Sequence, residues 1–428
     1  MLAGVFLVFV ITLFIGVPIG VSLIFSALCA SIINPSLTAN AMFIYRTMVT
    51  GLDSYVLLAI PLFILSGNIM AKGGISNRLF NFFSYFVGNK TAGLPIAVII
   101  SCLFYGAITG SGPATVAAIG AMTIPIMIES GYEKMFSVAL VTVAGGLGVI
   151  IPPSILFVAY GLASGASVGS LFIAGFIPGI IIGLCLIIYA YIYCKKKGED
   201  KEKLNAKHAV LKEKGFLPLF KETFWALLAP VIILGGIYTG IVTPTEAADI
   251  SVIYALFVSI FIYKSIKPKD LIPIFSSTIK SLVPLLFVCA GATVFARVLT
   301  LMQAPQQIAA LITNSISSTV IIILIMNLFL LVIGMIMDAI SAILIITPIF
   351  LPIALNIGID PIHLGIIMSV NLAIGFVTPP VGVNLYVGSS LAKVPVLALA
   401  KKCLPLIFWF LIALGLITFI PKISLILL

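Results

Sequence analysis

Charged residues are scarce in this sequence, and their scarcity constrains the fold more than any other feature. Only 8% of the residues are charged, whereas 62% are hydrophobic. Soluble globular proteins carry about 25% charged residues. A chain of 428 residues with so few charges lacks the polar surface that a water-soluble domain needs. Its apolar runs are long and continuous, unlike the alternating segments of a membrane β-barrel. The sequence therefore predicts an all-α, polytopic membrane protein.

The net charge of +10 does not indicate a nucleic-acid partner, because the basic residues form no single face. Eight of them lie between Lys195 and Lys214, beside four acidic residues, and most others flank apolar runs. Cytoplasmic connections of membrane proteins carry an excess of Lys and Arg. We therefore expect residues 195–215 to form a charged cytoplasmic loop and the chain to contact membrane lipid. The first apolar run lacks a preceding charged segment, so we expect a first span there and not a cleaved signal.

Gly and Pro residues interrupt the apolar runs and divide them into membrane elements. A hydrocarbon core about 30 Å thick takes about 20 helical residues. The predicted spans and short helices cover residues 2–16, 18–33, 52–72, 76–89, 168–194, 216–242, 246–263, 271–300, 304–313 and 396–420. Two interrupted stretches, 92–130 and 317–357, are predicted to be re-entrant helical hairpins. Two others, 133–165 and 361–391, are predicted to be broken transmembrane helices.

The two halves of the chain repeat each other. When the first half is shifted by 227 positions, Pro152-Pro153 falls on Pro379-Pro380, without a gap in the surrounding segment. We therefore divide the chain into a first repeat, residues 1–194, the connection 195–215, and a second repeat, residues 216–428. Paired Gly/Pro-interrupted segments at equivalent positions of two halves indicate the binding site of a secondary transporter.

The basic residues also predict the orientation of the repeats. If the 195–215 connection is cytoplasmic, nearly all basic residues lie on the cytoplasmic side, as the positive-inside rule requires. Both chain termini then lie outside the cytoplasm. The hairpin over 92–130 opens to the cytoplasm and the hairpin over 317–357 opens to the outside. The predicted fold is therefore two inverted repeats, each with one re-entrant hairpin and one broken helix.

Four irregular segments are predicted within the hydrocarbon region, where such backbone must be buried in protein or line a wet cavity. Two are hairpin tips, at Thr109–Thr115 and Met337–Ala342, and two are helix breaks, at Leu147–Ser154 and Ile374–Asn384. Carbonyls freed at a proline and nearby hydroxyls are oxygen ligands for cations, whereas helix N-termini suit anions. Pairing each tip with its own break gives two symmetry-related cation sites beside a central anion site. Simple proline kinks are the alternative.

Two charged residues in apolar surroundings are candidates for function. Asp338 lies at the second hairpin tip, and an intramembrane carboxylate is a functional hypothesis by default. It could neutralise a bound cation, carry a proton or cap the following helix, and these roles are compatible. The equivalent residue in the first half is Ser111, so the two cation sites would differ chemically. Arg297 ends a span near the outer side, where it either snorkels to the interface or contacts a substrate anion.

Catalysis is not expected from this chain. Gly165–Gly169 fits a G-x-S-x-G pattern, but it lies between membrane helices and follows no strand. The only histidines are His208 and His363, and no cluster has transition-metal spacing. The Gly-rich first tip lacks the lysine of a phosphate-binding loop, so transport would not be driven by ATP hydrolysis in this chain. An ion channel lined by the broken helices remains a more remote alternative to a transporter.

Three motifs resemble those of a known family. They are Gly240-Ile241-Val242-Thr243-Pro244-Thr245-Glu246-Ala247-Ala248, Gly110-Ser111-Gly112-Pro113-Ala114-Thr115 and Gly146-Leu147-Gly148-Val149-Ile150-Ile151-Pro152-Pro153-Ser154. Together they resemble the large membrane subunit of TRAP (tripartite ATP-independent periplasmic) transporters, the DctM/SiaM family. The similarity runs over essentially the whole chain, and it looks strongest to sialic-acid members.

The resemblance implies a bacterial inner-membrane protein that works with two partners. These are a small four-helix membrane subunit and a periplasmic substrate-binding protein that delivers an organic anion. It further implies coupling to Na⁺ with no other cofactor, and an elevator mechanism of the kind used in this ion-transporter superfamily. The implied substrate is sialic acid (N-acetylneuraminate), with a C4-dicarboxylate or another carboxylate as the alternative.

The resemblance also assigns site residues by their place in the motifs. The implied Na⁺-binding residues are Thr109, Ser111, Gly148, Asp338, Gly375 and Thr378. The implied substrate-binding residues are Pro153, Ser154 and Asn384. Glu246 is expected either to cap the helix that follows it or to meet a partner protein.

Overall fold

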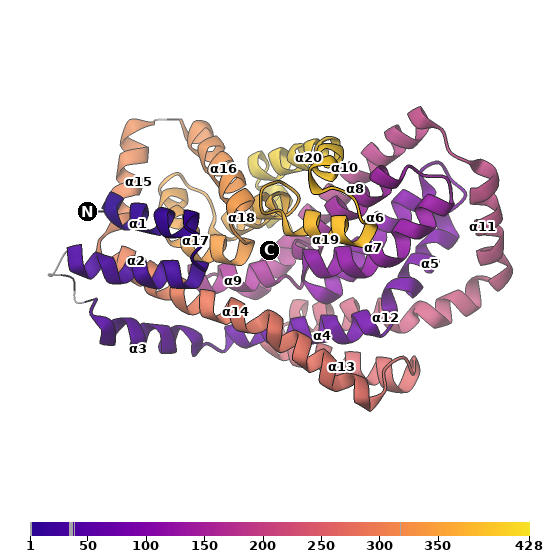
Figure 1. The fold of residues 1–428 in the computed structure, drawn as a ribbon, viewed down its shortest axis with the longest axis horizontal. Helices are drawn as coiled ribbons and strands as arrows, with labels where there is room; N and C mark the ends of the chain where they lie inside the picture. The colour runs from indigo at the N-terminus through magenta and orange to yellow at the C-terminus, as the bar shows by residue number, and fades with distance from the viewer. Residues whose placement is uncertain (1, 34–36, 38, 317) are drawn as a thin grey trace.

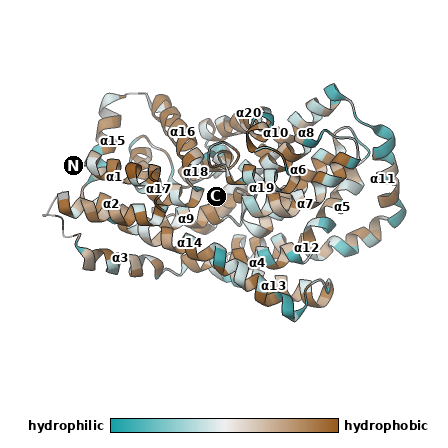
Figure 2. Ribbon diagram, viewed as in Figure 1, coloured by the Kyte–Doolittle hydropathy of each residue, from teal (hydrophilic) through white to brown (hydrophobic). Residues whose placement is uncertain are grey.

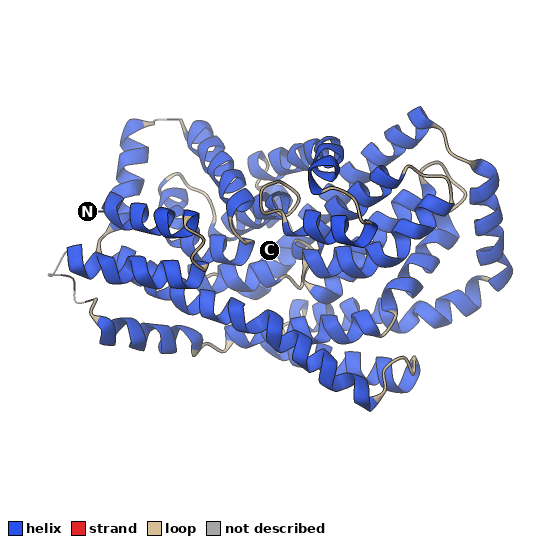
Figure 3. Cartoon of the chain, in the orientation of Figure 1, coloured by secondary structure: helices blue, strands red, loops and turns tan. Residues whose placement is uncertain are grey.

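The computed structural model consists of helices and connections throughout the residues that it describes, which are 2–33, 37, 39–316 and 318–428 (Figures 1 and 3). The all-α prediction is confirmed for these residues. Among the described residues, 8 helices could cross a membrane by length and composition, or up to 9 if a bent pair counts as one span. Residue 317, where the second predicted hairpin begins, lies outside the described residues.

One group of helices, which we call the frame bundle, runs along the left and lower sides of Figure 1. Within it α4 packs on α13, and α14 packs on α2 and α3. Its members are α1 (Leu2–Phe14), α2 (Ile19–Ile33), α3 (Ala41–Leu52), α4 (Ala59–Lys72), α12 (Phe216–Tyr238), α13 (Pro244–Phe257) and α14 (Pro268–Leu301).

A second group, the core bundle, contains the predicted hairpins and broken helices. In it α16 packs on α18, α17 on α9, and α10 on α20. Its members are α6 (Gly93–Thr109), α7 (Gly112–Glu129), α8 (Lys134–Ala144), α9 (Ile155–Ser164), α10 (Val168–Lys197), α16 (Thr319–Ile336), α17 (Ala339–Asn356), α18 (Pro361–Gly375), α19 (Val383–Ala392) and α20 (Val396–Phe419). The short helices α5 (Ile75–Val87) and α15 (Ala304–Ser315) contact both bundles, and α21 (Lys422–Leu425) ends the chain.

The helix bounds reproduce the sequence repeat. Shifting α6, α7, α8 and α9 by 227 residues predicts the starts of α16, α17, α18 and α19 to within one residue. Each hairpin is two helices that meet at a short non-helical tip, and each broken helix is interrupted at its Pro-Pro pair. The opposite membrane orientation of the two repeats, and the return of each hairpin within the membrane, stay predictions.

Two segments differ from the sequence-based expectation. The predicted span over 52–72 is the second part of a bent pair, in which α3 and the following Val56–Lys72 segment meet at 63°. Helix α3 was not anticipated, because its polar and charged residues hid a helix whose N-cap, Asn40, accepts a hydrogen bond from Phe43 N. The 195–215 connection is largely a helix, α11 (Lys201–Lys214), and not an irregular loop. Its Lys, Glu, Leu and Ala residues favour helix, and Asp200 caps it.

Hydrophilic residues gather at the end of the molecule that carries α11 (Figure 2). At this end Glu133, at the start of α8, contacts the ammonium of Lys402 in α20 at 2.8 Å. Glu133 also accepts a 2.5 Å hydrogen bond from the hydroxyl of Tyr193 in α10. The Lys402 ammonium and the Tyr193 hydroxyl hold the pKa of the Glu133 carboxyl below its ordinary value. These contacts join three helices of the core bundle at one end.

We expect Glu133→Gln to lower the unfolding temperature of the detergent-solubilised protein by about 1 °C at pH 7, as for a partly exposed ion pair. Because folding lowers the pKa of Glu133, its contribution is complete above the ordinary value of 4.5 and is lost as the pH falls through the folded value. Thermal unfolding at pH 7 and pH 3.5 measures this difference. A wild-type-to-variant gap that does not narrow between pH 7 and pH 3.5 contradicts the prediction. The exposed Glu213→Gln variant is the control.

Candidate functional site

The first hairpin tip is a short connection between two helix ends. Helix α6 ends at Thr109, Gly110 follows with φ +60°, and Ser111 is extended and caps α7. The Ser111 hydroxyl accepts a 3.5 Å hydrogen bond from Ala114 N. Thr115 donates to Ser111 O at 2.8 Å, and its hydroxyl lies 3.3 Å from that of Thr109. Several oxygen atoms therefore gather at a tip in which Thr109 and Thr115 are buried and Ser111 is partly buried.

The first helix break lies directly against this tip. A Cβ placed on Gly148 would lie 2.4 Å from Thr115 Oγ1 and 2.8 Å from Ser111 O, so the two backbones touch. Ile155 N, in the first turn of α9, donates to Gly110 O at 3.4 Å. The structure thus brings Thr109, Ser111 and Gly148 together, as the pairing of a tip with its own break requires.

The residues expected to bind substrate in the first half lie at the start of α9. Ser154 is fully buried and caps this helix by accepting a 3.4 Å hydrogen bond from Phe157 N. It also donates to Val149 O at 2.5 Å, so its hydroxyl is engaged on both sides of the break. Pro153 O would lie 2.7 Å from a Cβ on Gly110, which places the second proline beside the tip.

In the second half the hairpin arm α16 and the break meet through their backbones. Val381 N donates to Met335 O at 3.0 Å, and a Cβ on Gly375 would lie 2.5 Å from Gly334 O. Thr378 donates to the carbonyls of its own segment at 3.1 Å. The break that contains Gly375 and Thr378 therefore lies beside the last turn of the hairpin arm α16. Gly334, in that turn, is four residues before Asp338.

Asp338 caps helix α17. Its Oδ1 accepts hydrogen bonds from Ile340 N and Ser341 N, both at 3.1 Å, and its Oδ2 accepts one from the Ser341 hydroxyl. The carboxylate also borders a cavity of about 210 Å³ whose other wall is α14, at Pro284 and Val288. The capping role is observed. In the described part of the chain no hydrogen bond links Asp338 to Thr378.

Asn384, in the first turn of α19, joins the two halves. Its side chain is fully buried, and its Nδ2 donates to Thr142 O in α8 at 3.3 Å. Both of its side-chain polar atoms would lie 3.3 Å from a Cβ on Gly112, at the first tip. Its Oδ1 has no hydrogen-bond partner among the described residues. A substrate-binding candidate from the second half thus lies at the hairpin tip of the first.

Several buried polar residues near the breaks were missed from the sequence. The carbonyl of Thr142 faces Asn384, and the amide of Asn371 donates to Asn327 Oδ1 in α16 at 2.7 Å. Within the described chain, buried oxygen atoms of Thr142, Asn371 and Asn384 lack partners. The sequence could have revealed these residues, because each is polar and lies inside an otherwise apolar helix. A buried polar group of this kind needs a hydrogen-bond partner.

The candidate ligand atoms at the two tips and breaks fit a hard cation of low charge. It consists of hydroxyls, carbonyls and one carboxylate, and no group of three His, Cys, Asp or Glu residues with metal-binding geometry occurs among the described residues. Oxygen ligands suit alkali and alkaline-earth ions and not transition metals. The starts of α7, α9 and α19 lie close together and supply partial positive charge for an anion.

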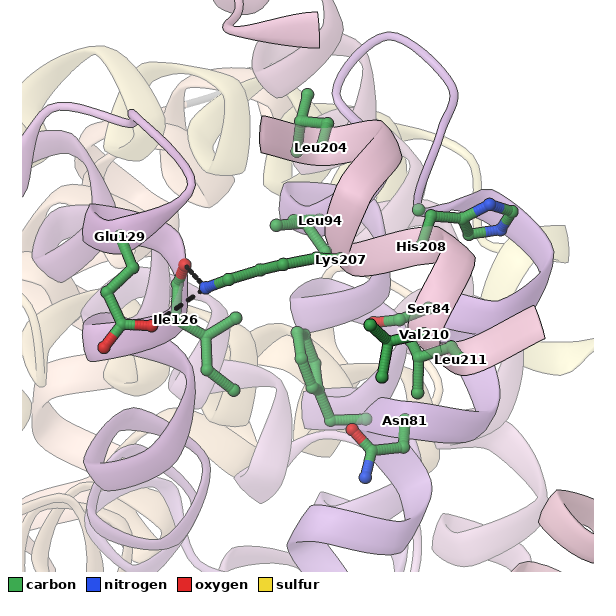
Figure 4. A pocket seen from close by; sticks show the side chains of 12 residues that line it. Asn81, Ser84, Leu94, Ile126, Glu129, Leu204, Lys207, His208, Val210 and Leu211 are labelled. Carbon is green, nitrogen blue, oxygen red and sulfur yellow. Dashed lines mark hydrogen bonds and ion pairs between the residues drawn. The ribbon is translucent and has the colours of Figure 1, made fainter. Parts of the chain in front are cut away.

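A cavity of about 340 Å³ at the α11 end is a poor alternative site for an anion. Figure 4 shows Lys207 reaching across it from α11 to Ile126 and Glu129 of α7. The ammonium of Lys207 lies 2.9 Å from the Glu129 carboxylate, so its charge is already balanced. The remaining lining is largely apolar, including Leu94 and Leu204.

Glu246 caps α13, which was one of the two roles expected for it. Its carboxylate accepts a 2.7 Å hydrogen bond from Thr243 N, and the Thr243 hydroxyl accepts one from Glu246 N at 3.3 Å. This reciprocal pair is a capping box. A contact of Glu246 with a partner protein stays a prediction.

The fold resembles those of solved membrane transporters. The YdaH transporter of Alcanivorax borkumensis aligns with 93% of this chain and 96% of its own, at a TM-score of 0.64 and 13% identity. MtrF of Neisseria gonorrhoeae aligns with 94% of this chain and 93% of its own, at 0.63 and 13% identity. At such low identity the likeness concerns the fold.

Sequence relatives are TRAP transporter permeases. The chain is 44% identical to the C4-dicarboxylate TRAP transporter large permease protein DctM of Pseudomonas aeruginosa, over 87% of this chain and 86% of that one. It is 43% identical, over 97% of its length, to the isethionate TRAP transporter permease protein DctMQ of Oleidesulfovibrio alaskensis, of which it spans 64%. It is 35% identical to the sialic acid permease SiaM of Vibrio cholerae, over 97% of this chain and 95% of that one.

These relatives are named as permeases and not as enzymes, in agreement with the absence of catalytic signatures expected from the sequence. A family model described as the tripartite ATP-independent periplasmic transporter, DctM component, matches residues 6–423. The chain therefore belongs to the DctM family, the large membrane permeases of tripartite ATP-independent periplasmic transporters.

Proposed function

We propose that this permease imports an organic anion together with Na⁺, by a secondary and not an ATP-driven mechanism. The observation that carries the proposal is the contact of each hairpin with the helix break of its own repeat. At the first tip, Ser111 and Thr115 supply oxygen ligands beside Gly148. At the second, Gly375 touches the backbone of Gly334, four residues before Asp338, whose carboxylate caps α17 and would supply the charged ligand. Each pair offers a Na⁺ site, and the two differ by one full negative charge.

The substrate is proposed to bind between these two sites. The starts of α7, α9 and α19 give partial positive charge, and Pro153, Ser154 and Asn384 line the region between the tips. Asn384 Oδ1 is a buried acceptor that a substrate hydroxyl or amide can satisfy. Binding of Na⁺ on either side would then raise the affinity for the anion, which couples the two solutes.

The substrate class is proposed to be a carboxylate or a sulfonate. The relatives named for C4-dicarboxylate and isethionate are 44% and 43% identical, and the relative named for sialic acid is 35% identical. The smaller anions are therefore tested first, and N-acetylneuraminate remains in the panel.

The proposed partners are those of the family: a small four-helix membrane subunit and a periplasmic binding protein in the bacterial inner membrane system, with both termini of this chain periplasmic. The division into a frame bundle and a core bundle suits an elevator, in which the core bundle carries the solutes past the frame.

Uptake by the reconstituted complex tests the proposal. Proteoliposomes containing both membrane subunits receive binding protein loaded with succinate, isethionate or N-acetylneuraminate, with or without an inward Na⁺ gradient. We expect saturable uptake of at least one anion, falling at least tenfold when K⁺ replaces Na⁺. Conductance without substrate and without saturation would favour a channel. Uptake that is indifferent to Na⁺ would remove the proposed coupling.

A further inference from the structure

A second cavity separates the two bundles at one end of α14. It has a volume of about 240 Å³. Thr293, Arg297 and Thr300 of α14 form one wall. Leu162 of α9 and Leu344 of α17 form part of the other. The cavity therefore lies between the frame bundle and the core bundle, outside the site described above.

Arg297 carries the only charge among the described side chains that line this cavity. Its side chain is exposed, and within the described residues no carboxylate lies within 4.0 Å of its guanidinium and no hydrogen bond engages it. Thr293 and Thr300 donate their hydroxyl hydrogens to the carbonyls of Cys289 and Ala296. The guanidinium is thus the group with free donors, arranged to bind a carboxylate or sulfonate at two points.

The cavity lies on helices that begin in the candidate site. Leu162 is eight residues beyond Ser154 along α9, about 12 Å at the helical rise of 1.5 Å per residue. Leu344 is six residues beyond Asp338 along α17, about 9 Å. Helix α14 also lines both cavities, since Val288 borders the one at Asp338 and lies nine residues before Arg297. The cavity at Arg297 therefore lies about 9–12 Å from the candidate site, measured along α17 and α9.

The surroundings favour weak and reversible binding. Arg297 lies in the last turns of α14, and α9 also ends near the cavity, at Ser164. The negative ends of two helix dipoles stabilise the guanidinium but disfavour a bound anion. Such a balance allows an anion to be captured and then released toward the positive helix starts of the candidate site.

We propose that Arg297 forms an outer anion-binding site, which holds the carboxylate or sulfonate of the substrate before it enters the site between the hairpin tips. This inference rests on the proposed import of an organic anion. It also relies on the predicted orientation, in which this end of α14 faces the periplasm.

Chemical labelling tests the site without transport. The chain has three arginines, Arg46, Arg78 and Arg297, and Arg78 is held over the ring of Tyr263. The complex of both membrane subunits is treated with phenylglyoxal, and peptides are quantified by mass spectrometry. We expect succinate, isethionate or N-acetylneuraminate to slow labelling of Arg297 at least threefold, whereas the exposed Arg46 is unaffected. Neutral succinamide is the control ligand. Equal labelling rates with and without all three anions overturn the inference.

Measuring uptake by Arg297 variants is a second test of the outer anion site. Arg297→Gln is expected to lower kcat/KM about 10- to 100-fold, because a hydrogen bond between charged groups is lost. Arg297→Lys should recover part of that loss. Lys280→Gln removes a positive charge from the same helix, about 25 Å away, and should behave as the wild type. Thermal unfolding checks that all three variants fold.

The outcomes separate this inference from the proposed function. Without anion uptake by the wild-type complex, the proposed function fails. Wild-type uptake combined with unchanged kcat/KM in Arg297→Gln removes only the outer anion site, and leaves Arg297 as a side chain that reaches the membrane interface.

Discussion

Replacing Asp338 by Asn is expected to lower Na⁺-driven uptake about 100-fold or more while leaving the hairpin tip folded. A cation about 4 Å from a carboxylate gains about 4 kcal/mol at an effective dielectric constant of 20, and the neutral amide forfeits that gain. Asn caps helices about as well as Asp. The hydrogen bonds from Ile340 N and Ser341 N can therefore be kept by the amide oxygen. The variant thus separates the charge of Asp338 from its capping role.

The chain offers a matched control for this substitution. Asp360 caps α18 with the same geometry, accepting hydrogen bonds from Ile362 N and His363 N. Its place at the far end of α18 keeps it away from either hairpin tip, so Asp360→Asn should leave uptake unchanged. Initial rates are measured across a range of Na⁺ concentrations, with unfolding temperatures for both variants. Normal uptake by Asp338→Asn at low Na⁺ removes the carboxylate from the coupling site and leaves it only as a cap.

The architecture could be predicted because it is encoded in local chemistry. The Pro-Pro pairs interrupt both broken helices, and Ser111, Ser154 and Asp338 each stand directly before a helix that they cap. The starts of four core-bundle helices therefore follow from the repeat and from capping rules alone. Helix α3 was missed because its polar residues gave no continuous apolar run, although it packs on α14.

The assembled site depends on long-range packing that the sequence pattern does not carry. The pairing of each tip with its own break was expected from symmetry. The approach of Asn384 to Gly112, across the two halves, was not. Nor was the amide pair of Asn371 and Asn327, which joins a broken helix to a hairpin arm. Such contacts require knowing which helix faces lie together, and all-apolar helices have no polar face from which to infer it.

Gly148 and Gly375, in the two helix breaks, lie where the chain has no room for a side chain. Family resemblance assigned Gly148 and Gly375 to the cation sites. The structure gives a physical reason for glycine at these positions, because each lies against the hairpin of its own repeat where a side chain does not fit. Their carbonyls can serve as ligands only if the two segments stay in contact.

Gly375→Ala is the substitution expected to disrupt the second tip and break most severely. A Cβ at this position would lie 2.5 Å from Gly334 O and 2.7 Å from Gly334 Cα. These atoms belong to backbone, which cannot turn away as a side chain can. Overpacking of this kind costs about 1–3 kcal/mol and should lower the unfolding temperature by about 1–3 °C. Uptake should fall at least tenfold, since the hairpin arm and the break no longer meet.

Two other glycines make the prediction graded. A Cβ on Gly334 would lie 3.3 Å from both Gly375 Cα and a Leu372 methyl group, so Gly334→Ala should have a milder effect. Gly415, inside α20, has nothing within 4 Å, and Gly415→Ala should be neutral or stabilising, as Ala favours helix by about 1 kcal/mol. Unfolding temperatures and uptake rates should therefore rank Gly375→Ala below Gly334→Ala, and both below Gly415→Ala. If Gly375→Ala matches Gly415→Ala in both measurements, close contact between the second hairpin and its break is not required for transport.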